Sequence, residues 1–146
     1  MQLSIRPIRE TDYRDVAIIW SDVLDIPTTE QELAAFYAQV GGDDRYQTFV
    51  AEADGKVIGL ITTVSALAIG HPNGYTKING LGVLPDYRRM GVGKALILRA
   101  EQESRENGTY YLGLATGLTR HDAHAFYENM GFRKTSYWFR KRVPEA

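Results

Sequence analysis

The stretch at residues 81–94 combines the residue types that bind a phosphate group. It reads LGVLPDYRRMGVGK, which is an apolar run, then a basic turn with glycines, then residues that favour a helix. Backbone N–H groups at a helix start point one way and carry the positive end of the helix dipole, so they bind anions. Gly91 and Gly93 let a ligand approach the backbone closely. Three basic side chains add positive charge to the same corner: Arg88, Arg89 and Lys94.

Two common phosphate-binding motifs do not fit this stretch. The dinucleotide fingerprint needs a third glycine, but position 96 is leucine, and no acidic residue closes a strand ~20 residues further on. A P-loop has Ser or Thr after its lysine, but Ala95 follows Lys94. A plain strand-turn-helix with glycines for tight packing also fits. The residues therefore predict a pyrophosphate site and leave the ligand open.

A second polar cluster lies at residues 120–124, which read RHDAH. His121 and His124 stand three residues apart beside Asp122, a spacing that suits a divalent metal. A polar helix face with a capping aspartate explains the same residues, and we predict no metal site. The chain has no cysteine, so disulfides, a thiol nucleophile and a thiolate metal site are excluded.

Composition points to one small globular domain over residues 1–146. Seventeen basic and eighteen acidic residues give a formal charge of −1, which offers no electrostatic footprint for a nucleic acid. No apolar run approaches the ~18–20 residues that cross a bilayer. The first residues lack the basic and apolar regions of a signal peptide. We therefore expect a cytoplasmic protein with neither nucleic acid nor membrane as partner.

The N-terminal half shows clear periodicities. Alternation predicts a strand from Leu3 to Arg9. Apolar residues at three- and four-residue spacing between Tyr13 and Leu24 predict a helix that begins at Thr11 and is ended by Ile26-Pro27. A second helix follows up to Val40, with Thr29 and Glu32 as a capping box. Two β-prone runs, 46–53 and 56–65, are joined by Asp54-Gly55, which predicts a hairpin.

The C-terminal half predicts three more strands and two helices. We expect a turn at 71–74, a strand at 75–83 stopped by Pro85, and a helix at 91–106. A buried strand at 110–116 follows, then a helix capped by Thr119 with Asp122 and ended by Gly131. The last strand is expected from Phe132 to Val143. This order defines an α+β domain whose antiparallel sheet turns parallel around the helix at 91–106.

Two segments resemble the GCN5-related N-acetyltransferases, the GNAT superfamily. The run Arg88-x-x-Gly91-x-Gly93 after a strand ending in Leu-Gly-Val resembles their acetyl-CoA signature. The run AHAFYENMGF at 123–132 resembles their last-helix segment, and the order of elements also matches. The resemblance implies a GNAT-like fold, with a central, mostly antiparallel mixed sheet, a parallel splayed strand pair and about four flanking helices.

The resemblance also implies acetyl-CoA as co-substrate, with coenzyme A as product. The splayed strand would leave amides free for the pantetheine arm and the thioester carbonyl: Leu81, Gly82 and Val83. The following turn would hold the pyrophosphate: Arg88, Arg89, Met90, Gly91, Val92, Gly93 and Lys94.

Tyr127 matches the family's general acid, which protonates the departing thiolate. A phenol with a pKa near 10 suits a thiolate whose conjugate acid has a pKa near 8.5. Tyr127 also lies on the apolar stripe of its predicted helix, so a packed aromatic is the alternative.

Asn79 stands where many relatives carry a glutamate as general base, and its amide cannot accept a proton from an ammonium. Several routes remain open. Water could be relayed by Asn79, a base could come from Glu52 or His71, or the acceptor amine could have a low pKa and need no strong base.

The function implied is transfer of the acetyl group of acetyl-CoA to a primary amine by direct attack in a ternary complex. We expect a small-molecule acceptor. Acetylation of a protein N-terminus or lysine, and a catalytically silent acyl-CoA-binding module, are the alternatives. Residues 120–127 resemble the aminoalkylphosphonate N-acetyltransferases, over too short a segment to assign a substrate. Relatives often pair, so a homodimer is also considered.

The first two helices border the acceptor pocket in this family. Trp20 lies on the apolar stripe of the first of them and is expected in the core. Asp22 and Asp25 near their junction either attract a cationic amine or form a solvated face.

Overall fold

The computed structural model describes residues 1–145, in two compact units. The first unit is Met1–Leu114, and the second begins at Ala115. Each unit is described by itself.

The first unit is built on a five-stranded sheet with the order β1-β2-β3-β4-β5. The strands β1 to β4 are antiparallel neighbours, and β5 runs parallel to β4. This mixed sheet confirms the predicted fold class. The strand bounds are Leu3–Pro7 (β1), Tyr46–Ala53 (β2), Lys56–Ala68 (β3), His71–Val83 (β4) and Leu112–Leu114 (β5).

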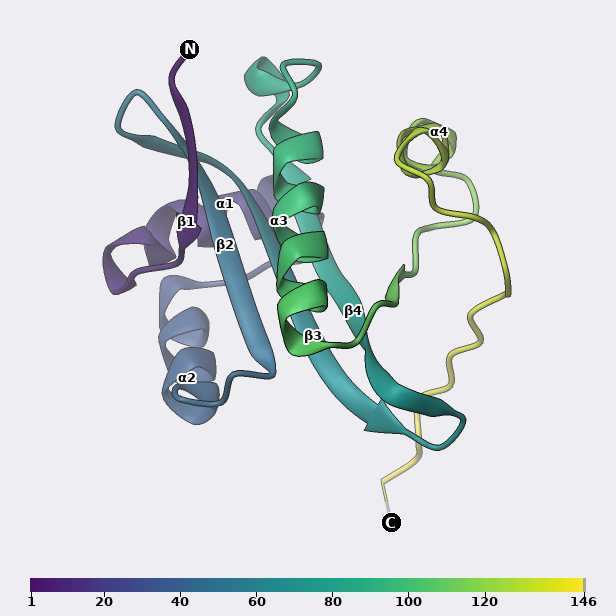
Figure 1. The fold of residues 1–146 in the computed structure, drawn as a ribbon. Helices are drawn as coiled ribbons and strands as arrows, with labels where there is room; N and C mark the ends of the chain where they lie inside the picture. The colour runs from purple at the N-terminus through teal and green to yellow at the C-terminus, as the bar shows by residue number, and fades with distance from the viewer. Residues whose placement is uncertain (146) are drawn as a thin grey trace. The chain divides into compact units, whose positions relative to one another are not determined.

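Three α-helices cover the two faces of this sheet. The helices α1 (Tyr13–Asp22) and α2 (Glu30–Val40) lie against one face, and α3 (Val92–Asn107) lies against the other (Figure 1). Two short 3₁₀ turns, η1 (Glu10–Asp12) and η2 (Pro85–Tyr87), precede α1 and α3. The second unit contains α4 (His121–Asn129).

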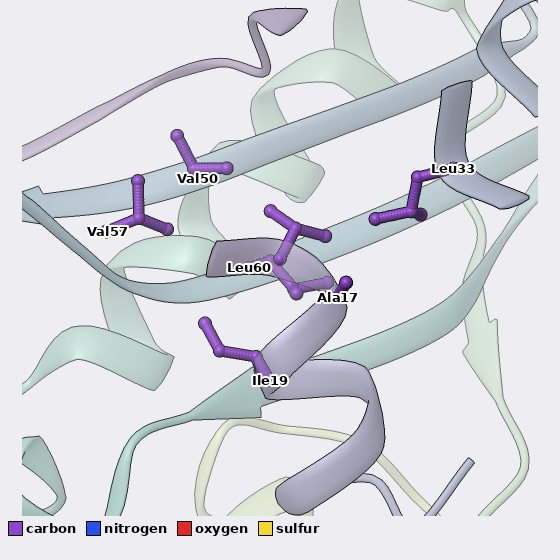
Figure 2. Close-up of a cluster of buried hydrophobic side chains, with 7 residues drawn as sticks. Ala17, Ile19, Leu33, Val50, Val57 and Leu60 are labelled. Carbon is purple, nitrogen blue, oxygen red and sulfur yellow. The ribbon is translucent and has the colours of Figure 1, made fainter. Parts of the chain in front are cut away.

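Aliphatic side chains pack between the helices α1 and α2 and the sheet (Figure 2). Burying such side chains is the main favourable term in folding. This core holds α1 against β2 and β3. The strand β3 is in turn paired with the C-terminal half of β4. The buried members of this core are Val16, Ala17, Ile19, Leu33, Val50, Val57 and Leu60.

Several local signals in the sequence are confirmed. The Thr29 hydroxyl accepts a hydrogen bond from the Glu32 backbone N–H at 3.1 Å, as an N-cap should. Asp54 and Gly55 have φ values of 52° and 79°, which is the left-handed pair that a tight hairpin requires. Gly108, with φ 73°, ends α3.

The predicted strand from Phe132 to Val143 is wrong, because residues 132–145 form neither helix nor strand. A strand exists only through hydrogen bonds to a partner strand. The aromatic composition of this segment raises its β-propensity but supplies no partner. Its side chains Tyr137, Trp138 and Phe139 are 79%, 67% and 91% exposed.

Three further expectations need correction. The turn lies at Ile69-Gly70 and not at 71–74, because residues 71–74 belong to β4, where the pairing register shifts. The strand predicted at 110–116 shortens to β5, since Tyr110 has a left-handed φ of 57°. The helix α4 begins at His121 after Arg120, with no side-chain cap from Thr119 or Asp122.

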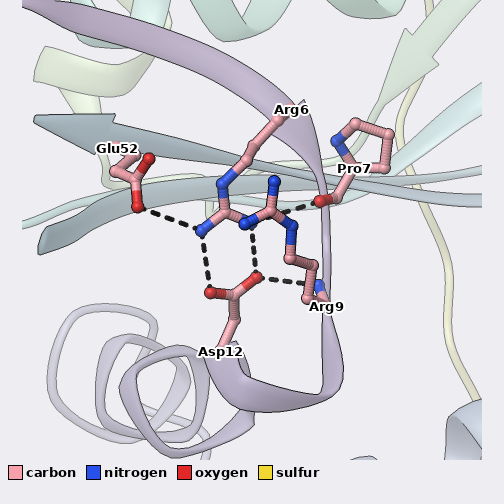
Figure 3. A network of polar contacts seen from close by, with 5 residues as sticks. All are labelled: Arg6, Pro7, Arg9, Asp12 and Glu52. Atoms are coloured by element: carbon pink, nitrogen blue, oxygen red, sulfur yellow. Dashed lines mark hydrogen bonds and ion pairs between the residues drawn. The ribbon is translucent and has the colours of Figure 1, made fainter. Parts of the chain in front are cut away.

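An ion-pair network ties β1 to η1 and β2 (Figure 3). The Arg6 guanidinium donates to both Asp12 carboxylate oxygens, at 2.7 and 2.9 Å, and also lies 3.3 Å from Glu52 Oε1. The Arg9 backbone N–H donates to Asp12 Oδ2 at 2.7 Å. Burial raises the pKa of Asp12, but the hydrogen bonds from Arg6 and Arg9 outweigh it, so the pKa lies below its ordinary value.

We expect Asp12→Asn to lower the free energy of unfolding by about 3 kcal/mol, because it leaves the half-buried Arg6 charge with only its longer contact to Glu52. The pKa of Asp12 is lowered in the folded state, so its stabilisation is present near neutral pH and is lost as pH falls through that pKa. Urea denaturation from pH 7 down to pH 2.5 should therefore show the variant and the wild type converging.

Asp43→Asn is the matched control. Asp43 pairs with Arg45 at 2.7 Å on the surface, where such a pair contributes little. An Asp12→Asn loss at pH 7 no larger than that of Asp43→Asn would contradict the structural importance of the buried pair.

Candidate active site

The sheet opens between β4 and β5. The two strands pair only where Thr76–Ile78 meets Leu112–Leu114. The strand β4 continues to Val83, whereas β5 ends at Leu114. Within the described residues, no strand pairs with the β5 side of residues 79–83. The C-terminal half of β4 therefore has one open edge.

A β-bulge at Asn79 turns the backbone at this open edge. Pairing with β3 runs from Ile78↔Thr63 to Gly80↔Thr62 and skips Asn79, and a bulge of this kind leaves its extra residue unpaired. Before the bulge, the Thr76 N–H donates to the Tyr111 carbonyl on the β5 side, at 2.9 Å.

After the bulge, the direction of the N–H groups is reversed. The Leu84 N–H donates to the Ile58 carbonyl on the β3 side, at 2.8 Å. Because N–H groups alternate between the two edges of a strand, those of Leu81 and Val83 point to the open edge. These two donors can bind an extended ligand or a carbonyl oxygen.

The turn after β4 leads directly into the N-terminus of α3. Arg89 and Gly91 have left-handed φ values of 62° and 83°. The first helical bond runs from the Ala95 N–H to the Gly91 carbonyl at 3.0 Å. The N–H groups of residues 92–94 therefore have no acceptor within the helix. No side chain caps α3, and its first turn holds no acidic residue.

The charges and the space at this turn also suit an anion. Arg88, Arg89 and Lys94 are exposed, and none of them pairs with a carboxylate within residues 1–145. A Cβ atom added to Gly91 would meet nothing within 4 Å. The structure thus places the predicted cofactor residues, 81–83 and 88–94, along one continuous segment of the first unit.

The three residues considered for proton removal, Asn79, Glu52 and His71, have different surroundings in the structure. Asn79 is exposed on the bulge itself. Glu52 Oε1 lies 3.3 Å from the Arg6 guanidinium, so its carboxylate is already engaged in the ion-pair network. His71 begins β4, and its ring lies 5.9 Å from the ring of Tyr75 and 6.0 Å from that of Tyr111.

Tyr127 lies on α4 of the second unit, between two other aromatic rings. Its ring centroid is 5.4 Å from that of Phe126 and 5.7 Å from that of Phe132. Burial raises the pKa of Tyr127 and the charge of Arg120 lowers it, with a net increase above 10. The phenol is therefore protonated at neutral pH and able to donate a proton.

The histidine cluster of the second unit makes contacts within its own segment. His124 Nε2 lies 2.8 Å from the Gly117 carbonyl oxygen, and the rings of His121 and His124 are 5.6 Å apart. In the described part of the chain, no three His, Cys, Asp or Glu residues gather as a metal site would require.

Two features of this region were not predicted from the sequence. The Trp20 ring lies against Gly80, and Arg89 has a left-handed backbone conformation without being glycine. Gly80 and Gly82 at two-residue spacing signal a close approach of another segment to one face of a strand. Nothing in the sequence signals the conformation of Arg89.

Comparison with known proteins agrees with this geometry. The model of the acetyltransferase (GNAT) family matches residues 7–132. The chain belongs to this family, and it is an acetyl-CoA-dependent N-acetyltransferase. It is 28% identical over 139 residues to the aminoalkylphosphonate N-acetyltransferase of Salmonella typhimurium, covering 93% of this chain and 90% of that protein.

Solved structures show the same fold. One is a transcriptional regulator from Bacillus halodurans, with a TM-score of 0.86 and 20% identity over 97% of this chain and all of that one. Another is an aminoglycoside antibiotic 6'-N-acetyltransferase from Acinetobacter baumannii, with a TM-score of 0.81 and 19% identity over 98% of this chain and all of that one. None of the described helices has the length and apolar character needed to span a membrane.

We expect Gly91→Ala to weaken binding of coenzyme A by on the order of tenfold, a loss of ~1.4 kcal/mol, because its methyl group obstructs the phosphate. Gly108→Ala is the matched control. Gly108 flanks the other end of α3, also has a left-handed φ, and also has open space around it.

Both variants should lose stability similarly, since a left-handed non-glycine residue costs about 1–2 kcal/mol. Calorimetry would measure the affinity. Equal loss of affinity in the two variants would count against a phosphate site at Gly91.

Proposed function

We propose that this acetyltransferase transfers the acetyl group to the primary amine of a small molecule, with residues 1–146 acting as one domain. The observation that carries the proposal is the open edge of β4, with its outward N–H groups, followed directly by the uncapped start of α3. One segment thus offers donors for a thioester and donors for a pyrophosphate. The match of the family model to both units supports the single domain.

The chemistry follows from the donors at this edge. The amine nitrogen attacks the thioester carbonyl carbon, and negative charge develops on the carbonyl oxygen. The Leu81 N–H stabilises that charge, as an oxyanion hole does. The C–S bond then breaks, and Tyr127 protonates the leaving thiolate. The raised pKa of Tyr127 keeps the proton in place until the thiolate forms.

The bulge carries Asn79 and no carboxylate, so another group must take up the proton that the amine loses. The Asn79 amide can orient a water molecule but cannot take up the proton. Glu52 is less suited, because its carboxylate is bound to Arg6. We infer that water held at the exposed Asn79 side chain carries the proton away.

The relative in Salmonella supports a small acceptor, since its name assigns it an aminoalkylphosphonate. The similarity covers nearly the full length of both chains. We therefore rank small amines, aminoalkylphosphonates among them, ahead of a protein N-terminus or lysine.

Thiol release from acetyl-CoA tests the proposal. We expect release with at least one small primary amine at neutral pH, and a kcat/KM at least tenfold lower with peptides that offer an N-terminus or a lysine. Coenzyme A binding without release across the panel would support the silent binding module. Faster release with peptides would support the protein acceptor.

We expect Tyr127→Phe to lower kcat and kcat/KM together, by up to ~10²–10⁴-fold, since the variant removes only the proton donor. The affinity for acetyl-CoA should stay within about twofold, because phenylalanine keeps the ring in place. The loss should shrink with an acyl donor whose thiol has a lower pKa.

Tyr110→Phe serves as the control, because Tyr110 is 69% exposed on the surface of the first unit. Steady-state and single-turnover rates would be measured for both variants. An unchanged chemical step in Tyr127→Phe would make Tyr127 a packed aromatic, as the alternative interpretation holds.

A further inference from the structure

We propose that Trp20 is a positioning residue for the reaction, because its indole ring rests on Gly80 and holds the bulge at Asn79. The bulge determines that the Leu81 N–H points to the open edge of β4. The inference rests on the proposed function, in which that N–H stabilises the oxyanion.

The contact between Trp20 and Gly80 leaves no room for a side chain. A Cβ atom built on Gly80 would lie 2.5 Å from Trp20 Cη2 and 2.7 Å from Cζ2. Both distances are shorter than any that real Cβ atoms tolerate. The outer end of the indole ring therefore occupies the space that every residue except glycine would need.

The neighbouring glycine extends this close approach along β4. A Cβ atom on Gly82 would lie 3.0 Å from Ile19 Cγ2 and 3.4 Å from Leu24 Cγ. Gly80 and Gly82 stand two residues apart and so face the same side of the strand. The end of α1 thus lies directly on the backbone of β4, at the two glycines that flank Leu81.

Contacts with the core and backbone hydrogen bonds at the end of α1 hold Trp20 in place. It packs against the apolar core under α1 and α2, and its carbonyl accepts the Ile26 N–H at 3.0 Å. The Val23 and Leu24 N–H groups both bond the Ile19 carbonyl, at 2.9 and 3.2 Å. The core contact determines where the indole ring lies, and these backbone bonds hold the end of α1 together beside Gly80.

The bulge needs such a support because its extra residue lies outside the ladder. A change of register by one residue along a strand reverses the side to which each group points. Movement of the bulge past Gly80 would therefore turn the Leu81 N–H back toward β3. The pyrophosphate donors of residues 92–94 lie further along the chain and would keep their places, so the transition state should suffer more than cofactor binding.

The test uses the Gly80→Ala and Trp20→Phe variants and the double variant. Phenylalanine lacks the outer ring atoms that approach Gly80, so it makes room for the alanine methyl group. We expect Gly80→Ala to lower kcat at least tenfold. Complete loss of an oxyanion donor costs about 10²–10³-fold in kcat, which is the upper limit for this effect. Coenzyme A affinity should stay within about twofold. The kcat of the double variant should recover to within about threefold of the kcat of Trp20→Phe.

Val16→Ala is the control for stability alone, since Val16 lies in the same core, fully buried on α1. It should lower the urea midpoint without changing kcat by more than about twofold. Three results would overturn the proposal: an unchanged kcat in Gly80→Ala, a double variant no better than Gly80→Ala, or a Val16→Ala variant that loses kcat to the same degree.

A binding measurement separates this inference from the proposed function. The ratio of acetyl-CoA to coenzyme A affinity reports the contact with the acetyl carbonyl without turnover. If the wild type binds acetyl-CoA but acetylates no amine, the proposed function fails. The inference about Trp20 then depends on whether Gly80→Ala lowers that ratio, and on whether the double variant recovers it to the value of Trp20→Phe. An unchanged ratio would overturn the inference as well.

Discussion

The single unpaired residue Asn79 is the constraint on which the candidate site depends. A regular β4 would keep the N–H groups of even-numbered residues facing β5, as that of Thr76 does. The extra residue shifts this alternation by one, so those of Leu81 and Val83 face the open edge instead. The end of β5 at Leu114 then leaves them without a partner strand in the described chain. Donors that a continuous sheet would use are available to a ligand.

In the proposed function, the same segment serves two different electrostatic tasks. The strand offers single N–H groups to a neutral carbonyl on which charge develops only in the transition state. The start of α3 offers several N–H groups, the helix dipole and exposed cations to a ligand that is already charged. A turn with left-handed residues at 89 and 91 joins them. Binding strength and rate acceleration can therefore be varied separately, through the turn or through the strand.

The sequence revealed the parts that local chemistry determines. The cap at Thr29, the hairpin at Asp54-Gly55 and the end of α3 at Gly108 each follow from one or two residues and are confirmed. The strand expected at 132–143 is wrong, because β-propensity does not supply a partner strand. The contact of Trp20 with Gly80 depends on how α1 lies across β4, which no local pattern encodes. Tyr127 matches the family's motif, and its role in the reaction stays a proposal.

The measurement that tests the central claim most directly is a crystal structure of the protein with acetyl-CoA or a non-reactive thioether analogue. We expect the acyl carbonyl oxygen within hydrogen-bond distance of the Leu81 N–H, about 2.7–3.2 Å. The pyrophosphate should lie on the N–H groups of residues 92–94. A structure in which the Leu81 N–H bonds another strand, or in which the acyl group lies away from the open edge of β4, would contradict the account.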